Sequence, residues 1–338
     1  MITTAAGAGV VTAFTTLVKY CLAGVQLPPF FLGVLSSLNY AVSFVLLYLL
    51  GWTLATKQPA ATAATLANAM RKLENDEDLE RIVELIARTT RSQLAAIAGN
   101  LGTVVPTVLL IDWLWRLGSG HAFFDAAHVE HALQSLHPFH SLLFLYAALT
   151  GVLLWMSSIG AGWVENWASY RRLSAAMARS RTLLRLLGES RRARFASAFS
   201  RNLAGLSGNV ILGFLLGMAP VLGAFFGLPT EIRHVTLSTG LLAFAASALG
   251  PGEVLHSSVL LAALGIGFIG FFNFAVSFRL ALWLASSACG IEPAAHARLR
   301  RAFFSQLLHN PGRFFLPPRA ADRSEAYASA SETRPEEG

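Results

Sequence analysis

The chain has 338 residues, of which 54% are hydrophobic and 13% are charged, and its mean hydropathy is +0.53. Charged residues make up about a quarter of an ordinary soluble domain, so this composition excludes a typical soluble enzyme and indicates a membrane protein. The 26 Lys and Arg exceed the 19 acids, and they are grouped between apolar stretches, where such groups report membrane topology. Two cysteines, Cys21 and Cys289, provide neither a disulfide framework nor a zinc ribbon.

The first two predicted membrane spans cover residues 5–25 and 29–52, and a tight link containing Pro28 and Pro29 joins them into a helical hairpin. The N-terminus has no basic region ahead of the first span, so we interpret it as a span and not as a removable signal peptide. Residues 53–92 are polar, and Asn75 is placed to cap an amphipathic helix there. This segment is predicted to be a cytoplasmic loop.

The third and fourth predicted spans cover residues 93–117 and 141–163, and the loop between them contains no Lys or Arg. The next loop, residues 169–201, carries nine arginines and Glu189 as its only acid. Because positively charged loops stay on the cytoplasmic side of a membrane, we expect the first loop outside and the second one inside.

The last two predicted spans cover residues 202–227, interrupted by Pro220, and 257–278. Between them lies an apolar run, residues 236–250, which is too short to cross a bilayer and is typical of a re-entrant segment. Six spans place both termini in the cytoplasm. The expected fold is therefore all-α and polytopic, with a transmembrane domain over residues 1–287 and a cytoplasmic tail over residues 288–338, whose end is expected to be disordered.

Several polar residues fall inside the predicted spans, where an unpaired polar group is costly. One amide lies in each of four spans, and two charged residues lie at similar depth in the first and third. The amides are Asn39, Asn100, Asn209 and Asn273, and the charged residues are Lys19 and Asp112. The amides are expected either to link helices by hydrogen bonds or to line a polar path, and the two charges have the depth to form an ion pair.

Five of the nine histidines lie in the predicted external loop. His128 and His131 are three residues apart, so they would share a helix face, as metal ligands often do. Their spacing matches no specific metal motif, and ordinary solvated histidines are the favoured interpretation. We expect no cofactor.

The arginine-rich loop alternates arginines with apolar residues, which suits a helix lying on an anionic lipid surface. The residues expected to contact anions are Arg171, Arg172, Arg191, Arg192 and Arg194. Lipid headgroups are the favoured partner, and nucleic acid is the less favoured one. Glycines at four-residue spacing, such as Gly213 and Gly217, predict close helix packing within the chain or in an oligomer.

Four short sequences resemble a known family. They are Leu38-Asn39-Tyr40, then Thr53-Leu54-Ala55-Thr56-Lys57-Gln58-Pro59, then Ile232-Arg233-His234-Val235-Thr236, and Phe314-Phe315-Leu316-Pro317-Pro318. This order is similar to bacterial membrane proteins catalogued as site-specific recombinases of the gonococcal crossover type. The resemblance implies a location in the bacterial inner membrane and relates this chain to the membrane-embedded C-terminal part of the family.

The family name implies DNA strand exchange, but we assign no catalytic residue. A tyrosine recombinase presents its nucleophile from a soluble domain among Arg and His residues, and here only Tyr170 and Tyr327 lie clearly outside the predicted spans. The sequence favours a structural protein, or one that binds a cytoplasmic partner protein, over an enzyme. The alternatives are a transporter or channel that uses the re-entrant segment, and DNA recombination as the family name implies.

Overall fold

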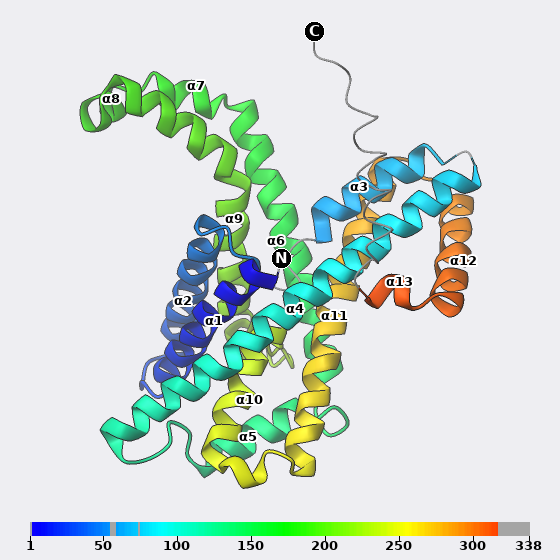
Figure 1. Cartoon of the computed structure of the whole chain (residues 1–338). Coiled ribbons are helices and arrows are strands. Elements are labelled where there is room, and N and C mark those ends of the chain that lie inside the picture. The colour runs from blue at the N-terminus through cyan, green and yellow to red at the C-terminus, as the bar shows by residue number, and fades with distance from the viewer. Residues whose placement is uncertain (1, 55–58, 74, 317–338) are drawn as a thin grey trace. The chain divides into compact units, whose positions relative to one another are not determined.

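The computed structural model describes residues 2–54, 59–73 and 75–316, and Figure 1 shows their helices in chain order. No strand occurs within these residues. Six helices are long and apolar enough to cross a membrane. They are α1 (Ile2–Ala23), α2 (Pro29–Leu49), α4 (Asp76–Ser119), α6 (Leu143–Tyr170), α9 (Glu189–Phe226) and α11 (Ser257–Ala288). The predicted all-α polytopic fold is confirmed.

The remaining helices are shorter. They are α3 (Pro59–Arg71), α5 (Ala126–Leu136), α7 (Leu173–Ala178), α8 (Arg181–Leu187), α10 (Val235–Leu249), the 3-10 turn η1 (Pro251–Glu253), α12 (Pro293–His309) and α13 (Gly312–Phe315). α10 covers nearly the same residues as the short apolar run in the sequence. The disorder predicted for the end of the chain concerns residues outside those that the structure describes.

Two of the long helices extend well beyond the predicted spans. α4 joins the amphipathic segment and the third span into one helix of 44 residues, and α9 joins the arginine-rich segment to the fifth span over 38 residues. No glycine or proline lies between residues 76 and 98 to end the first of these helices. The interruption predicted at Pro220 is wrong, because α9 continues through it. A proline removes one backbone hydrogen bond, a loss that helices in membranes tolerate.

The chain forms two compact units. Unit 1 comprises residues 1–63 and 95–283, and unit 2 comprises residues 64–94 and 284–338. The polar segment after the second span and the C-terminal segment, which the sequence separates, thus belong to the same unit. α4 and α11 each contribute to both units.

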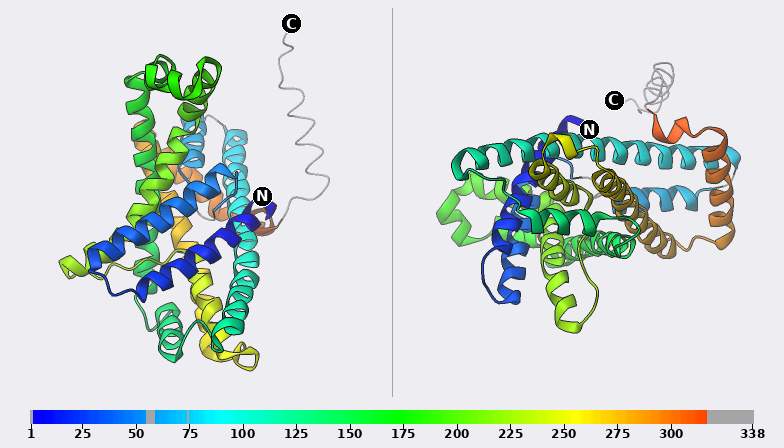
Figure 2. Two further views of the ribbon diagram at one scale, coloured as in Figure 1. Left: turned by 90° about the vertical axis from the view of Figure 1, so that its left-hand side faces the viewer. Right: turned by 90° about the horizontal axis from the view of Figure 1, so that it is seen from below.

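The core of unit 1 is built around α10, which Figure 1 shows beside α5 and Figure 2 shows from two further sides. Every residue from Val235 to Ala245 is buried, although a helix at the surface of a bundle buries only one stripe. Phe244 packs against Phe123 and Phe124, with ring centroids 5.0 and 5.3 Å apart. α10 is therefore an internal helix, enclosed on all sides over most of its length.

α2 and α9 pack backbone against backbone in unit 1. A methyl group added at Gly213 would lie 2.4 Å from the backbone nitrogen of Ala41, and one added at Gly217 would lie 2.4 Å from that of Ser37. Only glycine permits so close an approach. The close packing predicted from the glycine spacing is confirmed at these two positions, and both contacts lie within the chain.

This contact predicts that Gly217→Val destabilises the protein, because the added side chain must separate α2 from α9 at a cost of about 1 to 3 kcal/mol or more. Gly267→Val is the matched control, since a methyl group at Gly267 meets no atom within 4 Å. Thermal unfolding of the two variants in detergent, followed by tryptophan fluorescence, measures the difference. Equal losses in the two variants would contradict the close contact.

Candidate functional site

A non-helical segment leads from α9 into the buried helix α10, beginning at Gly227 with a φ of 66° and ending at Arg233 and His234. Arg233 is 8% exposed and His234 is 1% exposed. Among the described residues, both ring nitrogens of His234 are buried without a hydrogen-bond partner, and the side chain does not cap α10. The last two residues of this segment are therefore buried in a non-helical conformation at the start of α10, and both carry ionisable side chains.

Side chains from two long helices satisfy the backbone of this segment. The Asn273 side chain on α11 accepts a hydrogen bond from the Val235 N–H at 3.1 Å and donates to the carbonyls of Arg233 and Ala147, both at 2.9 Å. The Thr150 hydroxyl on α6 accepts from the Arg233 N–H at 3.0 Å. These bonds replace the partners that a helix would have supplied.

The Arg233 guanidinium is paired with Glu231, with 2.5 Å between Nη2 and Oε2. It also donates from Nε to the Ser135 carbonyl at 3.4 Å and lies 5.4 Å from the centre of the Tyr146 ring.

On its other side the segment is linked to Asn100 of α4. The Thr236 hydroxyl donates to Asn100 Oδ1 at 3.5 Å, and Asn100 Nδ2 donates to the carbonyls of Thr53 and Ala5 at 3.0 and 3.2 Å. Asn100 and Thr236 have no exposed surface. We call this continuous series of side chains and backbone, which comprises Glu231, Arg233, Asn273, Thr236, Asn100 and Thr53, the polar chain.

Three of the four amides predicted inside spans form bonds between helices. Asn39 donates to the Thr15 carbonyl at 2.9 Å, and Asn100 and Asn273 belong to the polar chain. Asn209 donates to Gly205 in its own helix. Hydrogen bonding between segments of the chain, one of the two expected roles, is therefore observed for these three amides.

Asp112 is fully buried and is not paired with Lys19. It accepts hydrogen bonds from the Phe123 N–H and the Ser247 hydroxyl, both at 2.7 Å, and from Arg116 at 2.8 Å. Arg116 lies one turn further along the same helix, so it reaches the carboxylate directly. In the described part of the chain no ion pair joins Lys19 to Asp112, and Lys19 instead lies 5.2 Å from the centre of the Tyr20 ring.

The histidine-rich loop forms the capped helix α5. Asp125 is its N-cap, and hydrogen bonds from the backbone N–H and the ring of His128 lower the pKa of the Asp125 carboxyl below its ordinary value. Across residues 2–54, 59–73 and 75–316 no three His, Cys, Asp or Glu side chains gather as a metal site would require. The weak metal candidate formed by His128 and His131 thus has no third ligand in the described chain.

Residues 171–201, which we call the arginine cap, form α7, α8 and the first turns of α9 and appear in green at one end of α6 in Figures 1 and 2. The cap carries nine arginines, and all except Arg192 are exposed. No ion pair that the structure describes includes any of them. Tyr170, at the end of α6, is 85% exposed. Four of the five predicted anion contacts therefore lie on an exposed basic surface, and the fifth, Arg192, is half-buried.

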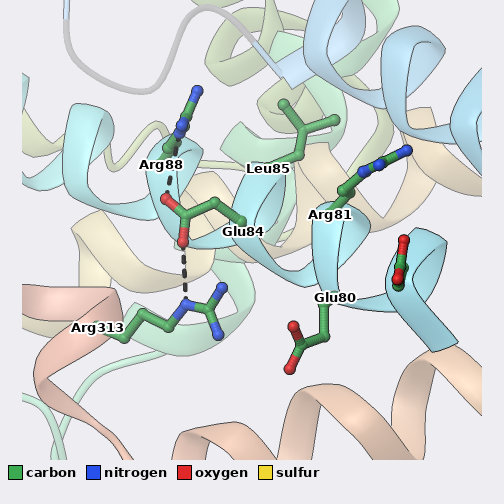
Figure 3. A pocket seen from close by; sticks show the side chains of 7 residues that line it. Glu80, Arg81, Glu84, Leu85, Arg88 and Arg313 are labelled. Carbon is green, nitrogen blue, oxygen red and sulfur yellow. Dashed lines mark hydrogen bonds and ion pairs between the residues drawn. The ribbon is translucent and has the colours of Figure 1, made fainter. Parts of the chain in front are cut away.

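Unit 2 contains a separate charged groove of about 500 Å³, whose lining Figure 3 shows. Glu84 lies at its centre and bonds Arg88 at 3.1 Å, Arg91 at 2.8 Å and Arg313 at 2.9 Å. Arg313 comes from the C-terminal segment, and no signal in the sequence indicated that it would meet Glu84. In this groove the arginines share a carboxylate, in contrast to the arginine cap.

A family model described as "Site-specific recombinase" matches residues 1–317. The chain belongs to the site-specific recombinase family. No curated protein and no solved structure matches it. Within this recombinase family member, two of the four motif segments contribute Thr53, Arg233 and Thr236 to the polar chain.

The other motif residues have different positions. Asn39 links α2 to α1, and Pro59 begins α3. Lys57 and Gln58 lie outside the residues that the structure describes, as does Tyr327. The sequence singled out Arg233, His234 and the amides separately, and it gave no sign that they would come together.

The polar chain predicts that Asn273→Ala destabilises this recombinase family member by about 1 to 3 kcal/mol, because it removes three buried hydrogen bonds and leaves the Val235 N–H without its side-chain acceptor. Asn39→Ala is the control with a single described bond and should cost less. Chemical unfolding of each variant in detergent measures both losses. A loss in Asn273→Ala no larger than that in Asn39→Ala would contradict the bracing role.

Proposed function

We propose that this chain is a multi-pass membrane protein that carries a small polar solute across the membrane along the polar chain. The observation that supports this is the series of polar contacts from Glu231, through the buried backbone at Arg233 and Val235, to Thr236, Asn100 and Thr53, in which the Thr236–Asn100 contact is the longest at 3.5 Å. Such a series of donors and acceptors offers a solute replacements for its water shell at each step.

The depth of the series supports the same proposal. Asn273 lies in the middle of the apolar helix α11, and Asn100 lies within the apolar part of α4. Irregular backbone at membrane depth occurs where it is buried in protein or lines a water-filled cavity. In transporters, short or broken helices often supply the binding site from such positions. Ionisable residues at this depth are costly and usually functional.

The sequence alone favoured a structural or partner-binding protein. A structural role would be fulfilled by apolar side chains at lower cost, since a buried ion pair contributes little to stability compared with well-packed apolar groups. The unpaired ring of His234 also gives a purely structural segment no advantage. Transport accounts for both features.

The proposal includes a location and a topology. We place the protein in a bacterial inner membrane with both termini in the cytoplasm, and we treat α10 as a re-entrant helix. The arginine cap then lies on the cytoplasmic side, where anionic lipid headgroups would neutralise it. Labelling of single cysteines introduced at residues 125 and 185, from either side of the membrane, would place them on opposite sides.

Transport is tested with purified protein in liposomes on a solid-supported electrode, with sodium acetate, sodium phosphate, potassium chloride and sodium glutamate as probes. Thr236→Val should reduce the flux at least tenfold, because it removes the hydroxyl that reaches Asn100 while keeping the side-chain shape. Thr107→Val is the control, since its hydroxyl bonds only the Thr103 carbonyl in its own helix among the described contacts. Equal flux in the two variants, or no flux above empty liposomes with any probe, would refute the proposal.

DNA strand exchange is a second candidate, which the family description and the arginine cap favour. Binding of duplex DNA to the protein in lipid nanodiscs, titrated against salt, is the first measurement, because phosphate contacts weaken steeply as salt rises. The triple variant Arg191→Gln, Arg192→Gln, Arg194→Gln tests the cap. The control removes the same charge from α12, by Arg298→Gln, Arg300→Gln and Arg301→Gln.

From the transport proposal we expect no DNA binding above that of empty anionic nanodiscs. Salt-dependent binding that only the cap variant loses, together with a covalent DNA adduct that Tyr170→Phe abolishes, would establish the second function instead. Tyr170 is chosen because it is exposed next to Arg171 and Arg172.

A further inference from the structure

We propose that a groove between α5 and the end of α10 binds an amphipathic organic cation, a molecule with an apolar body and a single positive charge. The groove, which we call the α5 groove, has a volume of about 510 Å³ and lies where Figure 1 shows α5 beside α10. Its lining includes the apolar residues Phe124, Val129, Leu133 and Leu249 and the acids Asp125 and Glu130. The inference goes beyond the proposed function and does not depend on the polar chain.

The apolar lining of the α5 groove belongs to the packed core of unit 1. Phe124 is 3% exposed and Val129 is 8% exposed, and the Phe124 ring lies 5.3 Å from that of Phe244 on α10. Leu133 packs against the same core. Because core side chains are close-packed in fixed rotamers, this wall keeps its shape when no ligand is bound. The volume of the groove also falls within the range of about 300 to 1,000 Å³ that small-molecule sites occupy.

The charge of the α5 groove is negative. Asp125 and Glu130 are exposed, and no Lys or Arg is among the described residues that line the groove. Asp125 accepts hydrogen bonds from the backbone N–H and the ring of His128, and Glu130 accepts one from Gln134 at 2.8 Å. Neither carboxylate is paired with a Lys or Arg in the part of the chain that the structure describes. Two ionised carboxylates therefore lie beside an apolar wall.

The apolar wall and the two carboxylates together define the class of ligand. An exposed carboxylate alone attracts a small cation only weakly, because water solvates both charges. An apolar body that covers Val129 and Leu133 adds the free energy of removing apolar surface from water. Small-molecule sites commonly combine a mainly apolar lining with a few polar groups that set specificity. Here those groups are both acids, so they favour a cation and repel an anion of the same shape.

The test compares tetraphenylphosphonium with tetraphenylborate, two ions of nearly the same shape and of opposite charge. Their binding to the purified full-length protein in detergent is measured by equilibrium dialysis at pH 8, where an ordinary histidine is neutral, and uptake by detergent alone is subtracted. We expect tetraphenylphosphonium to bind at least tenfold more tightly than tetraphenylborate. We also expect it to bind at least tenfold more tightly than tetramethylammonium, which has the same charge but little apolar surface.

The double variant Asp125→Asn, Glu130→Gln removes both charges and keeps the size of the side chains, and asparagine retains the ability to cap α5. The ratio of the two affinities should then shift at least tenfold toward tetraphenylborate. Glu165→Gln is the control, since Glu165 is an exposed acid of α6 that does not line the groove. It should leave the ratio unchanged. Leu249→Ser removes apolar surface from the lining, so it should weaken the binding of both ions.

A variant with a predicted gain keeps the test independent of stability. Ala126 is exposed, begins α5 and lines the groove, so Ala126→Lys brings a positive charge to the two acids. This variant should bind tetraphenylborate more tightly than the unaltered protein does, a gain that a misfolded protein would not show. An unchanged ratio in the double variant, or equally tight binding of the two ions by the unaltered protein, would overturn the inference. Absence of flux in liposomes would refute the transport proposal and leave this site in place.

Discussion

The rest of unit 1 depends on the need to satisfy the backbone at the point where the chain enters the buried helix α10. Arg233 and His234 are buried and lie outside a helix, and a backbone group without a partner in an apolar interior costs free energy comparable to a lost hydrogen bond. Asn273 supplies one acceptor and two donated bonds to this region, and the Thr150 hydroxyl supplies another acceptor. The position of Asn273 in α11 therefore follows from the break between α9 and α10, and it makes sense only once the backbone that it serves is known.

Hydrogen bonds from polar groups of α4 also hold the far end of α10. The Ser247 hydroxyl donates to Asp112 at 2.7 Å, and Arg116 Nη2 donates to the Ser247 carbonyl at 2.7 Å, where the last turn of the helix leaves carbonyls free. α10 is thus bonded to other helices by polar groups at its start and near its end, while apolar side chains surround its middle. Polar bonds are directional and apolar packing is not. These bonds accordingly fix the register of α10 in unit 1, and a movement of the helix along its axis would have to break bonds at both ends.

The sequence predicted six long apolar helices, and the described residues contain six that are long and apolar enough to cross a membrane. It also placed α10 almost to the residue, because Pro251 and Gly252 end the apolar run. The sequence did not predict that α4 and α9 extend beyond their spans, because no residue at the expected boundary ends the helix. Residues 76–98 contain no glycine or proline, so α4 begins in the polar segment, and Pro220 does not end α9. The candidate site was only partly predictable. An amide inside a span must find a partner, but which partner depends on packing between segments more than a hundred residues apart, as with Asn100 and Thr236. The pairing that the sequence suggested for Lys19 failed because Arg116 reaches Asp112 within one helical turn.

The three groups of arginines differ in how their charge is compensated, and this difference identifies the site. In the arginine cap the side chains are exposed, so water and counter-ions suffice and no structural partner is required. In unit 2 Glu84 neutralises part of the charge of Arg88, Arg91 and Arg313 at a half-open surface, where such pairs contribute modestly. At Arg233 the guanidinium is buried, and its carboxylate partner Glu231 lies 2.5 Å from Nη2. Removing such a pair from water can cost more free energy than the attraction returns, so well-packed apolar side chains would often be as stable or more stable. Folding stability alone therefore gives little reason to place this pair where the chain enters α10.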